Sequence, residues 1–303
     1  MKSKPKIIVI LGQTSTGKSD FAVQMAKEIS GEIISADSRQ VYKGMDLGTG
    51  KITKKEMRCV PHHLLDVANP KKVFTVSDYK KLAEKKIKEI IKRGNVPIIC
   101  GGTGFYIDAI ISGQVFPEVP PNKKLREQLI KKSKEELYKI LKKLDKNRAE
   151  TIDQNNPVRL IRAIEIAQAL GTVPKLADVG RLQKYEVLKI GLTLPDELLK
   201  ERIYKRILLR IKKGMIKEVE NLYKKGLSWK RMEELGLEYR YISQYLQGKL
   251  TKETMIDKLN IETWHYAKRQ KTWFKRDKET IWLNPLNKNE IKSVEKKIKD
   301  FLK

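Results

Sequence analysis

The sequence predicts an α/β fold in which helices flank a parallel sheet and an all-helical domain is inserted into the chain. Up to Cys100, short runs of β-branched apolar residues alternate with helical patterns, which is typical of such a sheet. The strand pattern stops at a proline-dense segment, residues 115–121, and resumes at Tyr185. We therefore expect a core domain of residues 1–116 and 184–303 and a helical insertion of residues 117–183.

The first strand, residues 7–11, leads into GQTSTGKS, which satisfies the phosphate-loop (P-loop) pattern at every fixed position. A helix over residues 20–29 follows, as this motif requires. Glycines let backbone amides surround an anion, Lys18 adds a mobile charge, and the Ser19 hydroxyl can bind Mg²⁺. We predict a core like that of nucleoside triphosphate hydrolases, with a phosphate chain bound by Gly12, Gln13, Thr14, Ser15, Thr16, Gly17, Lys18 and Ser19.

The charge balance indicates a polyanionic partner. The chain has 65 Lys and Arg against 37 Asp and Glu, a net charge of +28. Nucleic acid is the first candidate, and solvated lysine-rich helix faces are the alternative. The two cysteines, Cys59 and Cys100, lack zinc-site spacing and suit a reducing compartment. With no apolar signal region or membrane-length run, we expect a soluble, cytoplasmic monomer without an obligate protein partner.

Two further segments follow strands at the edge of the sheet where ligands bind. Strand 33–36 precedes Asp37, which could position Mg²⁺ through water, act as a general base or, least favoured, cap the next turn. Strand 96–100 runs into GGTGFY, where the Thr103 hydroxyl can reach a ligand. Strand 96–100 is not followed by the carboxylate that holds the metal ion in ordinary ATP hydrolysis, and this absence argues against that reaction.

The remaining elements follow from apolar periodicity and from Gly and Pro positions. His62 and His63 are adjacent and lack a third ligand, so we interpret them as structural or substrate-loop residues. We expect strand 61–67, an ordered loop 41–51, helix 76–93, insertion helices within 122–182 (123–132, 135–146 and 153–170), strand 185–194, helices 198–213, 215–225, 232–248 and 252–275, strand 280–283 and a terminal helix.

Cations fall in patterns on three of these helices. Arg159 and Arg162 share a face with Glu165 and either pair with acidic neighbours or, as we favour, contact phosphate or bases. Helix 198–213 carries an arginine stripe at 202, 206 and 210. Helix 252–275 interleaves aromatic and basic residues, which suits RNA backbone contacts with base stacking, although we expect Trp264 and Trp273 to be core anchors.

Six segments together resemble the tRNA dimethylallyltransferases, the isopentenyl transferases of tRNA, over nearly the whole chain. They are residues 12–19, 37–42, 61–66, 101–106, 159–165 and 266–274. The resemblance implies that the P-loop holds the diphosphate of dimethylallyl diphosphate with Mg²⁺ as cofactor. It also implies transfer of the dimethylallyl group to N6 of the adenosine 3′ of the anticodon, in tRNAs reading codons that begin with U.

The resemblance also implies roles for single residues. Asp37 matches the base and Thr103 a residue at the reacting centre, while Lys18 and Arg206 would offset charge on the diphosphate and Ser19 would bind Mg²⁺. The target base must leave the anticodon stack to reach such a site. The residues expected to contact tRNA are Asp37, Ser38, Arg39, Gln40, Thr103, Arg126, Val158, Arg159, Leu160, Ile161 and Arg162, with Lys268, Arg269, Lys271 and Lys275 from the basic helix.

The sequence departs from the family pattern at Leu208 and Arg210, where relatives carry an acidic residue and a methionine, and at Val158, usually polar or basic. No zinc finger follows the terminal helix, so we expect a bacterial-type member. A P-loop nucleotide or metabolite kinase would explain the phosphate loop and Asp37 but gives the basic aromatic helix no role. A non-catalytic RNA-binding module would explain the charge but not Asp37 and Thr103.

Overall fold

The structure is a computed structural model that describes residues 4–113, 116–174 and 184–303. The chain divides into two compact units, one made of Met1–Ser112 with Gln183–Lys303 and the other of Gly113–Leu182. No described helix is long and apolar enough to cross a membrane.

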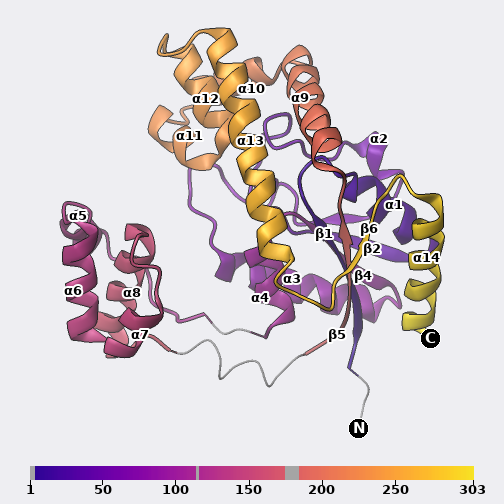
Figure 1. The fold of residues 1–303 in the computed structure, drawn as a ribbon, viewed down its shortest axis with the longest axis horizontal. Coiled ribbons are helices and arrows are strands. Elements are labelled where there is room, and N and C mark those ends of the chain that lie inside the picture. The colour runs from indigo at the N-terminus through magenta and orange to yellow at the C-terminus, as the bar shows by residue number, and fades with distance from the viewer. Residues whose placement is uncertain (1–3, 114–115, 175–183) are drawn as a thin grey trace. The chain divides into compact units, whose positions relative to one another are not determined.

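The larger unit is built on a six-stranded parallel sheet (Figure 1) with the order β3-β2-β4-β1-β5-β6. Its central strand β1 pairs with β4 on one side, Ile8 opposite Ile98, and with β5 on the other. This order brings the carboxyl ends of β1, β2 and β4 together. The strands are β1 (Lys6–Gly12), β2 (Gly31–Ser35), β3 (His62–His63), β4 (Val96–Gly101), β5 (Glu186–Leu192) and β6 (Ile281–Leu283).

Both faces of the sheet are covered because successive side chains of a strand point to opposite sides. In β1, Ile8 and Ile10 face a core with helices α1 (Lys18–Glu28) and α14 (Lys288–Leu302). Ile7, Val9 and Leu11 face a larger core. The helices on that side are α3 (Val76–Lys92), α4 (Gly104–Ile111), α9 (Asp196–Lys212), α10 (Met215–Lys224), α11 (Trp229–Leu235), α12 (Leu237–Leu246) and α13 (Lys252–Phe274).

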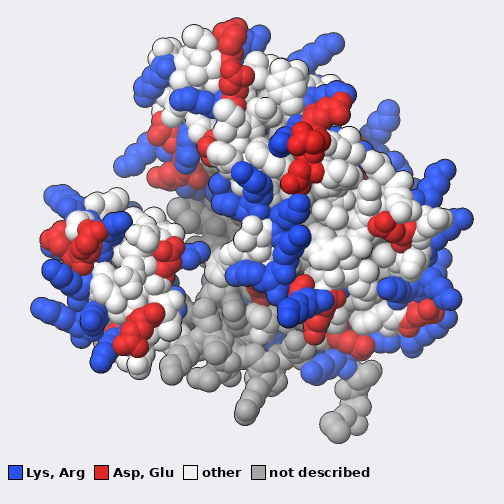
Figure 2. All heavy atoms as spheres, in the orientation of Figure 1, with Lys and Arg blue, Asp and Glu red and all other residues white. Residues whose placement is uncertain are grey.

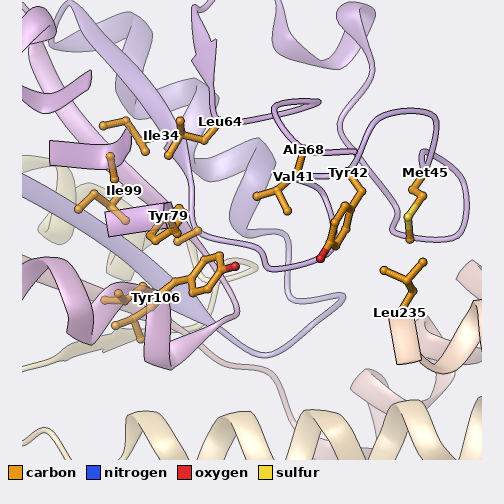
Figure 3. Close-up of a cluster of buried hydrophobic side chains, with 14 of the residues drawn as sticks. Ile34, Val41, Tyr42, Met45, Leu64, Ala68, Tyr79, Ile99, Tyr106 and Leu235 are labelled. Carbon is orange, nitrogen blue, oxygen red and sulfur yellow. The ribbon is translucent and has the colours of Figure 1, made fainter. Parts of the chain in front are cut away.

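The larger core continues from the sheet into the loop after β2. In Figure 3, Ile34 and Ile99 of the sheet lie on one side, and Val41, Tyr42 and Met45 extend the apolar cluster toward Leu235 of α11. The rings of Tyr79 and Tyr106 stack between them, with centroids 4.0 Å apart. This packing orders the predicted loop 41–51, which borders the site described below.

The smaller unit contains only helices among its described residues: α5 (Lys123–Leu129), α6 (Lys134–Leu144), α7 (Lys146–Thr151) and α8 (Pro157–Leu170). They enclose their own core, centred on Leu137, Leu141 and Leu160. Asn156 caps α8 and Pro157 opens it, because proline at the first helical position forgoes an N–H that has no partner there. The end of the predicted helical stretch, residues 175–182, lies outside the described residues.

Five elements differ from the sequence expectation, one of which is α7, a helix between the predicted helices 135–146 and 153–170. The predicted helix 232–248 is two helices, since Gly236 adopts φ +144°, and the predicted strand 61–67 contracts to β3. The short helix α2 (Lys54–Met57) was not predicted, although Thr53 and Glu56 form the capping box that marks its start. Helix α4 was also missed, because its glycines resembled a loop.

Candidate active site

A polar cavity of about 410 Å³ opens at the carboxyl ends of β1, β2 and β4. Its walls come from segments far apart in the chain: the P-loop, residues 37–40, the glycines after β4, loop 48–50, Arg206, the start of α12 and the middle of α13. A parallel sheet gathers such segments because every strand delivers its following loop to the same edge. The predicted site residues that line the cavity are Thr14, Lys18, Ser19, Asp37, Ser38, Arg39, Gln40, Arg206 and Arg269.

The P-loop has the backbone that an anion cradle requires. Gly12 adopts φ +140° and lies so close to the carbonyl of Leu192 that a Cβ would collide with it. Gly17, at φ +93°, turns the chain into α1, and the Thr16 hydroxyl donates to the carbonyl of Gln13 at 2.8 Å. The Gln13 side chain is buried, and neither of its amide atoms has a partner within the described residues. The groups of this loop that could bind an anion are therefore its backbone amides and Lys18.

The Lys18 ammonium points back into the loop and donates to the carbonyl oxygen of Gln13. Burial lowers the pKa of Lys18 from 10.5 to about 8, and the neighbouring Arg206 acts in the same direction. A cation held in a poorly solvated site is stabilised when an anion arrives. Burial also raises the pKa of Cys100 to about 12, so this thiol stays protonated at neutral pH and is a poor nucleophile.

Asp37 caps the turn after β2, which was the least favoured of its sequence interpretations. Its Oδ1 accepts the backbone N–H of Arg39 at 2.8 Å and that of Gln40 at 3.3 Å. Both bonds fall on one oxygen, so the second carboxylate oxygen remains available to a ligand. The cap therefore fixes the side chain at the cavity wall and is compatible with a role as base.

Thr103 is not among the residues that line the cavity, but it is hydrogen-bonded to Ser38, which does line it. Its hydroxyl accepts the backbone N–H of Ser38 at 3.0 Å and lies 3.4 Å from the Ser38 Oγ. Thr103 also precedes α4 as its N-cap residue. It thus connects the loops that follow β2 and β4, next to Asp37.

Gln270 of α13 is a site residue that sequence reasoning missed. Its Oε1 accepts the backbone N–H of Thr14 and its Nε2 donates to the carbonyl of Gly102, both at 2.8 Å. The buried side chain therefore joins the P-loop to the loop after β4. The sequence signal that could have identified Gln270 was its place as a polar residue on the buried face of α13. The other buried residues of this helix are Met255, Leu259, Thr263, Ala267 and Phe274.

Arg206 reaches the cavity from α9 and helps to hold loop 46–50. It donates to the carbonyl of Gly50 at 3.1 Å, and Arg210 donates to the carbonyls of Leu47 and Gly48. The carboxylate of Glu218 accepts the backbone N–H groups of residues 46, 47 and 48. Arg210, one of the two residues of this helix that depart from the family pattern, thus binds the same loop as Arg206.

Burial lowers the pKa of Arg206, and Arg210 adds to this effect. The guanidinium nevertheless remains charged because its ordinary pKa is far above neutrality. Arg206 and Lys18 thus place two positive charges on the wall of a cavity that also presents the Asp37 carboxylate. Cations beside a carboxylate suit a reaction in which an anionic group departs while a proton is removed.

Comparison with known proteins identifies the family. Residues 40–277 match the IPP transferase family. A Treponema denticola protein named tRNA dimethylallyltransferase 2 is 45% identical over 288 residues, covering 94% of this chain and 96% of its own length. A tRNA dimethylallyltransferase from Halothermothrix orenii is 40% identical over 307 residues, covering 98% and 93%. This chain belongs to the IPP transferase family.

Solved structures of similar proteins agree in fold. The tRNA isopentenylpyrophosphate transferase of Bacillus halodurans superposes with a TM-score of 0.75 at 35% identity, covering 99% of this chain and 97% of that one. A eukaryotic dimethylallyltransferase, studied by crystallography acting on tRNA, gives a TM-score of 0.80 at 26% identity, with 98% of this chain and 79% of that one covered. The P-loop-like sheet with a helical domain, predicted from the sequence, is thereby confirmed.

In this IPP transferase, the basic face of α13 is exposed (Figure 2), with Lys268, Arg269 and Lys275 open to solvent. Lys271 is half-buried and pairs with Asp196. The two tryptophans expected as core anchors are only half-buried, and both pack against the larger core. Arg276 stacks on the Trp273 ring at 4.0 Å, and Lys200 and Lys268 lie over Trp264, so each ring also contacts at least one cation.

The insertion residues expected to contact tRNA divide into three pairs. The side chains of Leu160 and Ile161 are buried in the core of the insertion, so a contact of these two residues with tRNA would have to involve their backbone. Val158 is 75% exposed, and Arg159 lies 3.7 Å from Asp153 at the surface. The remaining two residues, Arg126 and Arg162, both bind a buried carboxylate, as described below.

Proposed function

We propose that this IPP transferase moves a dimethylallyl group from dimethylallyl diphosphate to N6 of the adenosine 3′ of the anticodon, in tRNAs that read codons beginning with U. The observation that carries the proposal is the convergence of the P-loop, Asp37 and Arg206 on one cavity in a chain of this family. The names of its relatives support dimethylallyl transfer to tRNA and do not favour the kinase alternative.

The P-loop would hold the diphosphate of the donor. Uncapped backbone amides at the start of α1, Lys18 and Arg206 would bind its oxygens and offset the charge that grows as diphosphate leaves. Because these charges are fixed before the substrate arrives, little reorganisation is needed during the reaction. The charged form of Lys18, whose pKa is lowered by burial to about 8, would be stabilised by the bound diphosphate.

The residues present fit a bound Mg²⁺. Among the described residues, no group of three or more acidic, histidine or cysteine side chains could hold a metal ion, but Mg²⁺ usually keeps several waters and binds one or two protein oxygens together with substrate phosphates. The exposed Ser19 hydroxyl lines the cavity and would supply a protein oxygen. When bound, the ion would neutralise charge on the diphosphate.

Asp37 would act as the general base toward the target amine. The exocyclic N6 of adenine is a weak nucleophile because its lone pair is conjugated with the ring, so loss of its proton must accompany attack on C1 of the donor. The cap on Oδ1 would hold the carboxylate in place while Oδ2 accepts that proton. Thr103, bonded to Ser38, would keep the neighbouring backbone in position.

One assay tests the proposal. The protein and Mg²⁺ are incubated with unmodified tRNA and labelled dimethylallyl diphosphate, and a parallel tube contains ATP without the prenyl donor. We expect label to appear in tRNA and ATP to remain intact. ATP consumption without transfer of label would favour a kinase, and tRNA binding with neither reaction would favour a non-catalytic RNA-binding module.

A further inference from the structure

The insertion contains a buried carboxylate that is bound by two of the predicted tRNA-contacting arginines. Arg126 of α5 donates to Glu165 from Nε at 2.7 Å and from Nη2 at 2.6 Å, and Arg162 of α8 donates from Nη1 at 3.2 Å. The Glu165 side chain is only 1% exposed, whereas those of Arg126 and Arg162 are 44% and 35% exposed. The buried Glu165 carboxylate thus binds two arginines whose side chains are partly exposed.

Glu165 and Arg162 together connect α8 with two other parts of the insertion. Glu165 lies within α8, its Oε1 also accepts the backbone N–H of Asn122, which caps α5, and Arg162 donates a further bond to the carbonyl of Val119 at 2.8 Å. Burial acts to raise the pKa of Glu165, but the hydrogen bonds from Arg126, Asn122 and Arg162 outweigh burial and lower it. The carboxylate is therefore ionised at neutral pH.

Charge alone does not account for a glutamate at this position. Glu165 cancels one of two positive charges on a surface expected to meet RNA, so its electrostatic effect opposes binding. Its geometric effect is the opposite, since a guanidinium already fixed by a bidentate partner loses less conformational entropy when it meets a second ligand. The side chains of Arg126 and Arg162 remain partly exposed, so a phosphate or a nucleobase could approach them.

We infer that Glu165 is a positioning residue for tRNA binding, which holds Arg126 and Arg162 in the orientation that contacts the RNA. The inference rests on the proposed function, because it takes tRNA as the ligand. It assigns Glu165 no contact with RNA, since its carboxylate is buried behind the two arginines.

Removing the charge of Glu165 distinguishes positioning from electrostatics, because the two effects predict opposite changes in tRNA affinity. With the full-length protein and unmodified tRNA, Glu165→Gln is expected to weaken binding about tenfold, because the arginines must then be ordered on binding. The matched control is Glu127→Gln, which removes the same charge from an exposed carboxylate beside Arg126 that bonds to neither arginine in the described structure. That control should bind tRNA as tightly as the unchanged protein or slightly more tightly.

A double substitution tests whether Glu165 acts through the arginines. In an Arg126→Ala, Arg162→Ala background, Glu165→Gln should no longer weaken binding, since no side chain remains to be positioned. Circular dichroism and thermal unfolding of each variant establish that the insertion stays folded. A folded Glu165→Gln protein that binds tRNA at least as tightly as the unchanged protein would overturn the inference, as would an equal loss of affinity in both backgrounds.

The same measurements distinguish failure of this inference from failure of the proposed function. Prenyl transfer to tRNA by the unchanged protein, combined with tighter binding by Glu165→Gln, would leave the function intact and remove the role of Glu165. Absence of both transfer and tRNA binding by the unchanged protein would instead contradict the function on which the inference rests.

Discussion

One carboxylate lies at each end of β2, and the two differ in how many of their oxygens accept hydrogen bonds. At the start of the strand, Glu32 is 3% exposed and both of its oxygens are occupied: Oε1 by Arg93 and Asn95, and Oε2 by Arg93 and His63. At the other end, Asp37 is half-buried and only its Oδ1 accepts hydrogen bonds from described residues.

The difference indicates what each end of the sheet does. A buried carboxylate whose oxygens are both bound by neighbouring side chains is held within the fold and is not open to another ligand, and removing one of its partners is destabilising. A carboxylate fixed through one oxygen keeps the other for chemistry. His63 accordingly belongs to the structural end, which explains one histidine of the pair without any metal.

The largest predicted effect is loss of turnover at the Asp37 end. Asp37→Asn keeps an oxygen that can accept the amides of Arg39 and Gln40, so the turn should survive while the base is lost. We expect kcat to fall by roughly 10³ and tRNA affinity to stay near normal, measured by single-turnover transfer and by direct binding. An unchanged rate would refute the assignment of the base.

The second effect is loss of stability at the Glu32 end. Arg93→Ala leaves the Glu32 carboxylate buried without its bidentate partner, which should lower the free energy of unfolding and with it the urea midpoint. Urea unfolding measures this change. The kcat at a temperature where the variant stays folded should match that of the unchanged protein, and a large fall in kcat would show that the two ends are not independent.

A third effect concerns pH. Burial acts to raise the pKa of Glu32, but hydrogen bonds from Arg93, Asn95 and His63 outweigh it and lower the pKa from 4.5 to about 2. The folded state therefore binds this proton less readily than the unfolded state, so the contribution of Glu32 is present above pH 4.5 and is lost as pH falls toward 2. Urea midpoints should show a shallower acid loss for Glu32→Gln than for the unchanged protein over that window, and equal slopes would contradict this.

The smallest effect is expected at Gln270, which joins two loops at the functional end. Gln270→Leu removes the acceptor of the Thr14 amide, and the KM for dimethylallyl diphosphate should rise about tenfold. Gln24→Leu is the matched control, because the Gln24 amide bonds to Glu295 at the surface and Gln24 does not line the cavity. Steady-state kinetics of both variants make the comparison, and equal KM values would remove Gln270 from the site.

Local patterns predicted the strands, the P-loop and the place of Asp37 at the sheet edge, because each of these features is encoded by neighbouring residues. The split at Gly236 was missed because an isolated glycine is tolerated in helices. Contacts between distant residues could not be predicted in the same way. Glu218 binds amides about 170 positions away and Gln270 reaches Thr14 across 256 positions, and only the assembled fold brings such partners together.

The most direct test of the account is to locate the prenyl group in the product. Unmodified tRNA is treated with the protein, dimethylallyl diphosphate and Mg²⁺, digested, and analysed by mass spectrometry. We predict N6-dimethylallyl adenosine at the nucleotide 3′ of the anticodon and its absence after treatment with Asp37→Asn. A prenyl group on any other atom or nucleotide, or no prenyl group with the unchanged protein, would contradict the account.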